Sequence, residues 1–455
     1  MTDAVSPAEP YPGASSSVAA TEACLARIER LDPVLQAFIT VTAEEARAAA
    51  RAADAAKREG RSLGLLHGMP VAIKDCIDVA GVRCTAGSSF FADRIAETDA
   101  AVVTRLRAAG AVILGKTNLH EFAYGGTTQN AFYGGCRNPW DTNRIPGGSS
   151  GGSAVAVAAG LSAGALGSDT GSSIRMPAAL TGATGLRPTG GSVPAAGVLP
   201  VSPPHDVVGP LAGSVADVAR IQAAIVDPEQ ALRHGVEPAD FLTGLDGDVA
   251  GLRLAIPDDF FFSEADPEIA ELVLAAARVL ETGGARLVAK SIPGAAEAQS
   301  NLMPLLFVDA ATFHRQRLED NPDGFSIGVR TRLQPGLDMR AVDYARRLRW
   351  LEDWRARCEA FFRDEADAMI TPTVPIVAPE VGDDSRLTEV SSRLSRFCWA
   401  WPAARMPALS VPCGFSAGLP VGMQIAAGRW RDALVLALGH AFQQETGWHR
   451  MTPGL

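Results

Sequence analysis

The sequence lacks most of the features that mark nucleic-acid-binding, membrane and secreted proteins. Its formal net charge is −10, so no excess of Lys and Arg is available for a nucleic acid or an anionic membrane. No uninterrupted apolar run is long enough to span a bilayer. The N-terminus, MTDAVSPAEPYPGASSS, has neither the basic start nor the apolar core of a signal peptide. We therefore expect a cytoplasmic protein without nucleic-acid or membrane partners.

The cysteines also lack the pattern of a disulfide-bonded or metal-binding protein. The seven cysteines are scattered and odd in number, and no CxxC or Cys/His cluster occurs. Neither a disulfide framework nor a zinc site is indicated. His120 and Glu121 are adjacent, so they would not face one point as a metal pair, and a structural role is favoured. No metal or cofactor is predicted.

The composition is that of a globular protein. Of 455 residues, 47% are hydrophobic and 20% charged, which is ample for one large domain or several smaller ones. No repeat or clean linker divides the chain. We predict a flexible arm over residues 1–17 and one domain over 18–455, with a more charged lobe inserted at about 227–381.

Helical and strand patterns alternate along the chain and predict an α/β layout with helices covering a sheet. The stretch from Gly182 to Pro210 is rich in Gly and Pro, so neither a long helix nor a central strand is expected there. The main predicted elements are helices at Thr21–Leu31 (ended by Pro33), from the capping box Thr42-x-x-Glu45 to Gly60, after Ser214, and at Pro267–Thr282, Ala341–Ala366 and Arg431–Thr446, with strands at Pro70–Ile77, Ala111–Leu114, Leu409–Pro412 and Gly422–Ala426.

The most informative stretch is Gly147–Pro177, GGSSGGSAVAVAAGLSAGALGSDTGSSIRMP. Two Gly/Ser turns flank a predicted helix, Ser153–Gly160, and a predicted buried strand, Leu161–Ser168. Small residues at element ends leave backbone N–H groups accessible to a substrate. The two turns offer Ser149 and Ser173 as candidate hydroxyls.

Known serine-hydrolase and phosphate motifs fit this stretch poorly. Gly147–Gly151 matches G-x-S-x-G in letters, but no strand leads into it. The run lacks the lysine of a P-loop. A remote histidine partner stays open, and so does a serine nucleophile with a lysine base. Lys74 interrupts the apolar run PVAIKDCI; it either extends to solvent from a strand edge or, if buried, acts as a base with a lowered pKa.

Several motifs together resemble one family, the amidase signature family of Ser–cis-Ser–Lys serine hydrolases. The resemblance covers about residues 21–226 and 370–450. The motifs are PVAIKD (Pro70–Asp75), GKTNLHEFA (Gly115–Ala123), GGSSGGS (Gly147–Ser153), GSDTGSSIRMPA (Gly167–Ala178), GLRPT (Gly185–Thr189), and PALSVPCGF and GLPVGMQ near the C-terminus.

The resemblance assigns roles to individual residues. It implies that Ser173 is acylated, that Ser149 bridges protons after a cis peptide bond with Gly148, and that Lys74 is the general base and acid. The residues implied for the oxyanion hole and substrate contact are Thr170, Gly171, Ser172 and Ala123. The residues implied as supporting are Ser150, by a hydrogen bond to Ser149, and Asp169 and Arg175, which brace the loop.

The resemblance also implies a fold and a reaction. The fold is α/β, a mixed central sheet with helices on both faces, in a single domain with an elaborated lobe. The reaction is cleavage of the C–N bond of an amide or carbamate, without cofactor, by a monomer or homodimer. The alternatives are a catalytically silent binding subunit and the glutamine-hydrolysing subunit of a tRNA-dependent amidotransferase.

Substrate choice is the least determined property. The family pattern is departed from at Ser172, at Gly190 and Gly191, and at Arg405 within Pro402–Pro407. An apolar or aryl substrate is expected if the aromatic residues of the variable region line a pocket and do not form core. These candidates are Met303, Leu306, Phe307, Phe313, Phe397, Trp399 and Trp401.

Overall fold

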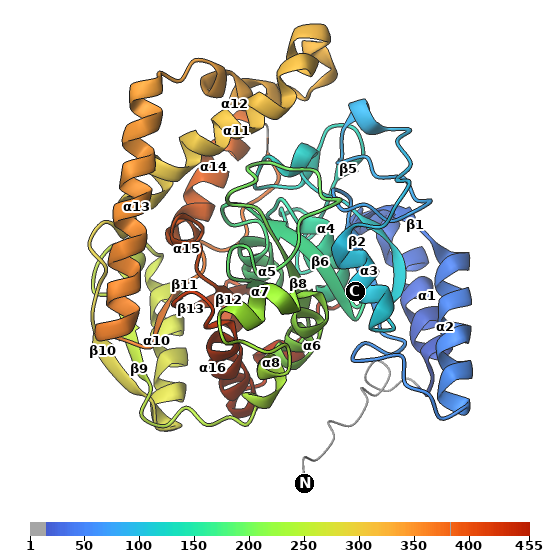
Figure 1. The fold of residues 1–455 in the computed structure, drawn as a ribbon, viewed down its shortest axis with the longest axis horizontal. Coiled ribbons are helices and arrows are strands. Elements are labelled where there is room, and N and C mark those ends of the chain that lie inside the picture. The colour runs from blue at the N-terminus through green and yellow to red at the C-terminus, as the bar shows by residue number, and fades with distance from the viewer. Residues whose placement is uncertain (1–14, 383) are drawn as a thin grey trace.

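A mixed sheet of 11 strands runs through the molecule (Figure 1). The computed structural model describes residues 15–382 and 384–455. The strands, in spatial order, are β1 (Phe38–Val41), β3 (Val112–Thr117), β2 (Pro70–Lys74), β6 (Gly164–Asp169), β8 (Val207–Ala212), β7 (Thr184–Arg187), β12 (Ala408–Ser416), β13 (Leu419–Ala427), β11 (Ala368–Pro372), β9 (Arg253–Ile256) and β10 (Arg286–Ala289). A separate pair joins β4 (Gln129–Asn130) to β5 (Gly134–Gly135).

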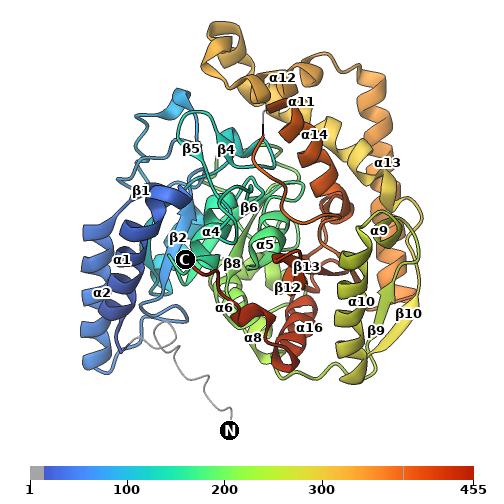
Figure 2. The same ribbon diagram turned by 180° about the vertical axis from the view of Figure 1, so that it is seen from behind.

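Helices cover both faces of this sheet. The helices are α1 (Ser17–Leu35), α2 (Ala43–Arg58), α3 (Ala101–Ala108), α4 (Gly151–Ala158), α5 (Arg175–Thr181), α6 (Val215–Ile225), α7 (Pro228–Arg233), α8 (Asp240–Thr243), α9 (Phe260–Ser263), α10 (Pro267–Thr282), α11 (Ala298–Asp320), α12 (Ile327–Leu337), α13 (Ala341–Asp364), α14 (Asp384–Ser395), α15 (Ala400–Ala404) and α16 (Asp432–Glu445). Figure 2 shows α1 and α2 at one end of the molecule and α10 and α13 towards the other.

Alternation along β2 shows how the two layers form. Successive strand side chains point to opposite faces. Val71 and Ile73 join a core cluster with α6 and α16, whereas Ala72 joins the cluster that holds α4 and α5. Small residues are needed on the α4 side, since a Cβ at Gly152 of α4 would lie 2.4 Å from the Asn118 carbonyl oxygen just after β3.

The Gly/Ser stretch folds largely as predicted. The helix is α4 and the strand is β6, each shifted by two or three residues from its predicted start. Ser214 caps α6 by accepting a hydrogen bond from the Asp217 N–H, as its position suggests.

Two predicted helix signals fail. The first helix continues past Pro33 to Leu35, so the proline lies inside α1. Thr42 precedes α2, but its side chain makes no capping bond. Its hydroxyl donates to the Ile113 carbonyl of β3, a tertiary partner that the local motif cannot reveal.

The prediction that the Gly- and Pro-rich stretch holds no central strand is wrong. Its ends form β7 and β8, in the middle of the sheet. Gly209 fits because any Cβ there would lie 2.2 Å from the Leu186 carbonyl oxygen. The pairing of β7 with β8 covers Thr184–Gly185 and stops short of Pro210, so the missing N–H leaves no gap in that ladder.

The structure also shows where the predicted N-terminal arm and the predicted lobe lie. Most of the predicted arm lies outside the described residues, and Ser16 already caps α1. The stretch 227–381 supplies β9, β10 and β11 to the sheet, and its helices α11, α12 and α13 stand above and beside it (Figure 1). Within the described residues, no helix is long and apolar enough to cross a membrane.

Candidate active site

The predicted site residues gather at one edge of the sheet. β2 and β6 are parallel neighbours, so their carboxyl ends meet there. Lys74 is the last residue of β2 and Asp169 the last of β6. Ser149 and Ser173 come from the turns that precede α4 and α5. The Ser150 N–H donates to the Ser173 carbonyl (3.2 Å), which joins the two turns.

Lys74 is completely buried and contacts two hydroxyls. Its Nζ lies 2.6 Å from Ser149 Oγ and 2.9 Å from Ser168 Oγ. Burial lowers the pKa of Lys74 to about 8, against a smaller opposing effect of Cys76, Asp169 and Asp206. A substantial fraction of the amine is therefore neutral near physiological pH and able to accept a proton.

Ser149 is held from several sides. The peptide bond between Gly148 and Ser149 is cis. The Ser149 carbonyl accepts from the His120 N–H at 3.2 Å. The predicted hydrogen bond from Ser150 to Ser149 is replaced by another one: Ser150 Oγ bonds the N–H and the carbonyl of Ser168. Ser150 thus fixes the other residue that contacts Lys74.

Ser173 stands on the wall of a cavity and is only half-buried. In the part of the chain that the structure describes, no acceptor takes the N–H groups of Gly171, Ser172 or Ser173. Thr170 Oγ1 donates to the Asp206 carboxylate (2.6 Å), which in turn accepts from the N–H groups of Val201 and Ser202. The loop from Thr170 to Ser173 is thus anchored at Thr170, and its next three backbone N–H groups have no acceptor among the described residues.

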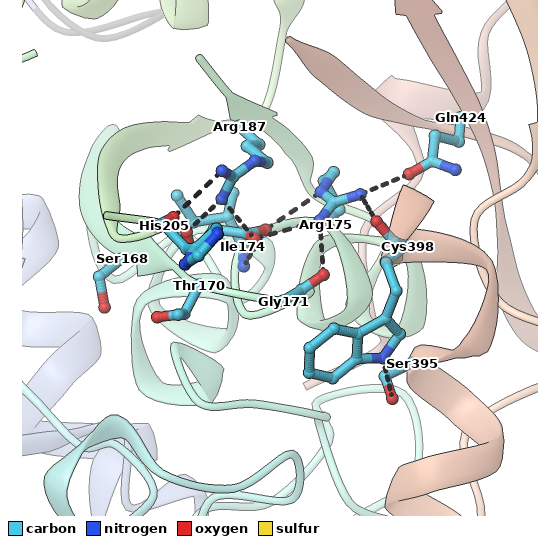
Figure 3. Close-up of polar contacts among 12 residues, drawn as sticks. Ser168, Thr170, Gly171, Ile174, Arg175, Arg187, His205, Ser395, Cys398 and Gln424 are labelled. Atoms are coloured by element: carbon cyan, nitrogen blue, oxygen red, sulfur yellow. Dashed lines mark hydrogen bonds and ion pairs between the residues drawn. The ribbon is translucent and has the colours of Figure 1, made fainter. Parts of the chain in front are cut away.

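Asp169 and Arg175 brace this loop through a buried network (Figure 3). Arg175 donates to both Asp169 oxygens, at 3.1 Å each, and to the Gly171 carbonyl (2.8 Å). Its remaining bonds reach the Cys398 carbonyl and Gln424 Oε1, both at 2.8 Å. Although burial opposes it, the positive charges of Arg175 and Arg187 lower the pKa of Asp169 to about 2. The carboxylate stays ionised and the loop is tied to three distant segments.

Three members of this arrangement were not predicted from the sequence. Arg187 also donates to Asp169, and Gln424 receives Arg175 from β13. Ser168 contacts Lys74 directly. Arg187 stands in the motif GLRPT, but nothing in the sequence shows that it reaches Asp169. Ser168 precedes Asp169 in the motif GSDTGSSIRMPA, but nothing in the sequence shows which neighbours it reaches.

The cavity beside Ser173 has a volume of about 670 Å³. Ala123, in a left-handed conformation (φ 57°), lines it together with the loop at Thr170–Ser173. Its apolar wall comes mostly from the helical lobe. The residues of that wall are Tyr124, Val201, Met303, Leu306, Phe307, Pro335 and Trp399.

Only some of the predicted pocket residues belong to this wall. Met303, Leu306, Phe307 and Trp399 line the cavity. Phe397 and Trp401 lie in a core cluster instead, where Phe397 packs edge-on to Phe260. Phe313, on α11, packs against the neighbouring ring of His314.

His120 and Glu121 have structural partners, as expected. His120 lies between Thr127 Oγ1 (3.2 Å) and Arg332 Nη2 (2.9 Å). Glu121 accepts from Ser88 Oγ at 2.7 Å and from the Ser326 N–H. No cluster of His, Cys, Asp and Glu among the described residues could hold a metal ion.

Comparison with known proteins places the chain in a family. The family model described as Amidase matches residues 19–436. The glutamyl-tRNA(Gln) amidotransferase subunit from Chloroflexus aurantiacus is 40% identical, over 97% of this chain and 96% of its own length. The corresponding protein of Moorella thermoacetica is 39% identical, over 97% and 95% of the two chains.

Solved structures agree. A chain from a structure of a vestigial protein complex, reported to reveal the evolutionary origins of an s-triazine catabolic enzyme, has a TM-score of 0.88 and 35% identity, covering 94% of this chain and 95% of that one. The native peptide amidase of Stenotrophomonas maltophilia has a TM-score of 0.83 and 30% identity, covering 95% and 94%. The chain belongs to the amidase signature family.

Proposed function

We propose that this protein hydrolyses an amide C–N bond through an acyl-enzyme on Ser173. The observation that carries the proposal is the buried Lys74 amine, which lies 2.6 Å from Ser149 Oγ. Ser149 belongs to a turn that is hydrogen-bonded to Ser173 through the Ser150 N–H. A lysine whose pKa is about 8 is a suitable base for a serine hydroxyl.

Protons move along a relay of three side chains in this mechanism. Neutral Lys74 takes the proton of Ser149 while Ser149 takes that of Ser173, whose oxygen attacks the substrate carbonyl. The protons return along the same path to the leaving nitrogen, and the C–N bond breaks. Water then attacks the ester by the same relay, releasing the acid and restoring Ser173.

The loop from Thr170 to Ser173 supplies the oxyanion site in this proposal. The N–H groups of Gly171, Ser172 and Ser173 have no acceptor among the described residues and border the cavity. Donors that are fixed before reaction stabilise the developing negative charge, and one such donor contributes about 10²–10³-fold to kcat. The network of Asp169 and Arg175 keeps these donors in place.

Glutamine is the substrate that the relatives favour. The relatives at about 40% identity are named as a subunit of glutamyl-tRNA(Gln) amidotransferase. In this chain, Arg332 and Glu389 line the cavity and carry the two charges that would complement an amino acid's carboxylate and ammonium groups. As such a subunit, the protein would require partner subunits and tRNA, in addition to a small amide.

An apolar or aryl amide is the second candidate, and the cavity wall supports it. Phe307, Leu306 and Trp399 give the cavity a largely apolar surface large enough for an aromatic acyl group. Aryl carbamates present the same carbonyl to Ser173 and extend this class.

A covalent probe tests the nucleophile. We expect a fluorophosphonate to add one adduct to the wild type and none to Ser173→Ala, measured by intact mass. Ser392→Ala, which removes another hydroxyl of the same cavity, is the matched control and should label normally. The Ser173 variant should also lose turnover by at least about 10⁴-fold with an unchanged circular dichroism spectrum. Labelling of Ser173→Ala would refute the assignment.

Turnover measurements then decide between glutamine and an aryl amide or carbamate as the substrate. Glutamine hydrolysis that rises when the partner subunits of a relative's amidotransferase are added would establish the first candidate. Hydrolysis of an aryl amide or aryl carbamate by the chain alone would establish the second. A labelled protein that binds these compounds without turnover would indicate a silent binding subunit.

A further inference from the structure

Three arginines gather near the predicted active site without taking part in it. Arg355 comes from α13, Arg405 follows α15, and Arg429 follows β13. Arg187, which bonds Asp169 of the site, is paired across the sheet with Ala408, the first residue of β12. The loop that carries Arg405 therefore lies at the same edge of the sheet as Lys74 and Asp169.

The three guanidinium groups lack acidic partners. None forms an ion pair with a carboxylate in the described ranges 15–382 and 384–455. Arg355 donates to the Ala403 carbonyl (3.1 Å) and Arg405 to the Gly190 carbonyl (3.4 Å). The Nε atoms of Arg405 and Arg429 are buried and have no acceptor among these residues.

Contacts between their segments bring the three arginines together: Arg355 donates to the Ala403 carbonyl, two residues before Arg405, and the Ala427 N–H, two residues before Arg429, donates to the Pro407 carbonyl at 3.4 Å. Burial and then Arg405 and Arg429 lower the pKa of Arg355, while the exposed Glu352 and Glu359 on the same helix oppose this effect. Burial and then Arg429 lower the pKa of Arg405. Burial and the charges of Arg355, Arg187 and Arg405 also lower the pKa of His205 to about 3. Positive charge is thus concentrated in a partly buried place in a protein with a net charge of −10.

Two departures from the family pattern meet at this cluster. Gly190 and Arg405 are 215 positions apart, yet the Gly190 N–H donates to the Arg405 carbonyl at 3.1 Å. A Cβ at position 190 would lie 3.1 Å from both Cβ and Nε of Arg405, and one at 191 would lie 3.3 Å from Nη2. The glycines make room for the arginine, so the two departures form one local feature.

We propose that Arg355, Arg405 and Arg429 form a binding site for an oxyanion, a phosphate or carboxylate group. Guanidinium groups bind such anions in a bidentate manner, and the orphaned Nε–H donors are suited to this contact. None of the three lines the cavity beside Ser173. The site is therefore separate from the proposed hydrolysis, and a binding measurement tests it without turnover.

The experiment compares three proteins: the wild type, Arg429→Met and Arg349→Met. Each is measured in chloride buffer and in buffers of the same ionic strength that contain inorganic phosphate or acetate. The buried Nε of Arg429 has no acceptor among the described residues, so removing this side chain leaves no acceptor of that group unpaired. Arg349 is exposed on the same helix as Arg355 and serves as the control. We expect saturable phosphate or acetate binding by calorimetry to wild type and Arg349→Met, and at least a tenfold higher Kd for Arg429→Met.

The melting temperature gives a second readout. Since the cluster repels itself when no anion is bound, Arg429→Met should melt at or above the wild-type temperature in chloride and should gain less from the anion. Saturation by phosphate alone assigns a phosphoryl ligand, and saturation by acetate assigns a carboxylate. Arg405→Met replaces Arg429→Met if the latter does not fold. Absence of saturable binding to the wild type, or equal binding by the cluster variants, overturns the proposal.

Discussion

The lowered pKa of Lys74 follows from its surroundings and not from its residue type. An exposed lysine is almost wholly protonated at neutral pH, whereas burial lowers the pKa of Lys74 to about 8. The two hydroxyls of Ser149 and Ser168 supply hydrogen bonds that the amine can make in either protonation state. A lysine enclosed in this way is suited to repeated proton transfer.

The pH dependence of activity tests this account. Because the neutral amine is the base, kcat/KM should rise about tenfold per pH unit below pH 8 and level off above it. Lys74→Met should lower kcat/KM by about 10²–10⁴-fold and abolish this inflection. Lys57→Met, exposed on α2, is the control and should keep both. An unchanged profile in Lys74→Met would make Lys74 structural.

Among the elements, the start of α5 is held to its neighbours by several buried contacts. Asp169 at the end of β6 accepts from the Ile174 N–H and from two buried arginines, so strand, loop and helix are bound together. Trp399 packs against the other side of the same loop, since a Cβ on Gly171 would lie 2.7 Å from its ring. The loop has little room to move.

Neutralising Asp169 should show how much the buried ion pairs with Arg175 and Arg187 contribute to stability. Asp169→Asn leaves two buried guanidinium groups without a counter-charge, and we expect a loss of about 3–5 kcal/mol in the free energy of unfolding, measured with urea. Asp141→Asn breaks a partly exposed pair with Arg144 and should cost less than about 1 kcal/mol. Equal losses in the two variants would contradict this interpretation.

Gly171→Ala tests the fit of the loop against Trp399. The added methyl group must displace either the ring or the N–H donors, so we expect kcat to fall by about 10²-fold with a smaller change in KM. Gly213→Ala has open space around its Cβ and should leave the kinetics unchanged. Unaltered kcat in Gly171→Ala would show that the donors do not depend on this contact.

On the scale of the whole molecule, the cavity is formed where the sheet edge meets the helical lobe. The loop at Thr170–Ser173 supplies one wall, and α11, α12 and α14 supply most of the rest. In the proposed mechanism, the reacting groups and the cavity wall that would contact the substrate therefore come from different parts of the chain. Under this proposal, substitutions in the lobe should alter substrate preference and leave the chemistry at the sheet edge unchanged.

Phe307→Ala separates selection from chemistry. The Phe307 ring lines the cavity and packs edge-on to Tyr124, with centroids 5.9 Å apart. If an aryl group binds there, kcat/KM for an aryl amide should fall at least about tenfold, while that for a small aliphatic amide changes little. Leu348→Ala, exposed on α13, controls for general effects. Equal losses for both substrates would remove Phe307 from substrate selection.

Local patterns were sufficient for several conclusions. The Gly/Ser turns offer Ser149 and Ser173 as candidate hydroxyls and the helix–strand alternation predicts the α/β class, because each pattern depends on near neighbours in the chain, whereas the role of Lys74 was implied by the family resemblance. The same patterns did not predict β7 and β8, since Gly209 is required by the carbonyl of Leu186 on an adjacent strand. They also indicated Thr42 as a cap, although its hydroxyl bonds Ile113.

The sequence by itself determined which chemistry is available: two serine hydroxyls, one lysine and a loop of small residues in the order typical of the family. Only the tertiary structure decided which side chains surround that chemistry. Phe307 and Trp399 face the cavity while Phe397 and Trp401 lie in the core. Burial, and with it the pKa of Lys74, arises when segments far apart in the chain pack together. The hydrogen bond between Arg175 and Gln424, 249 positions apart, likewise forms only when distant segments pack together.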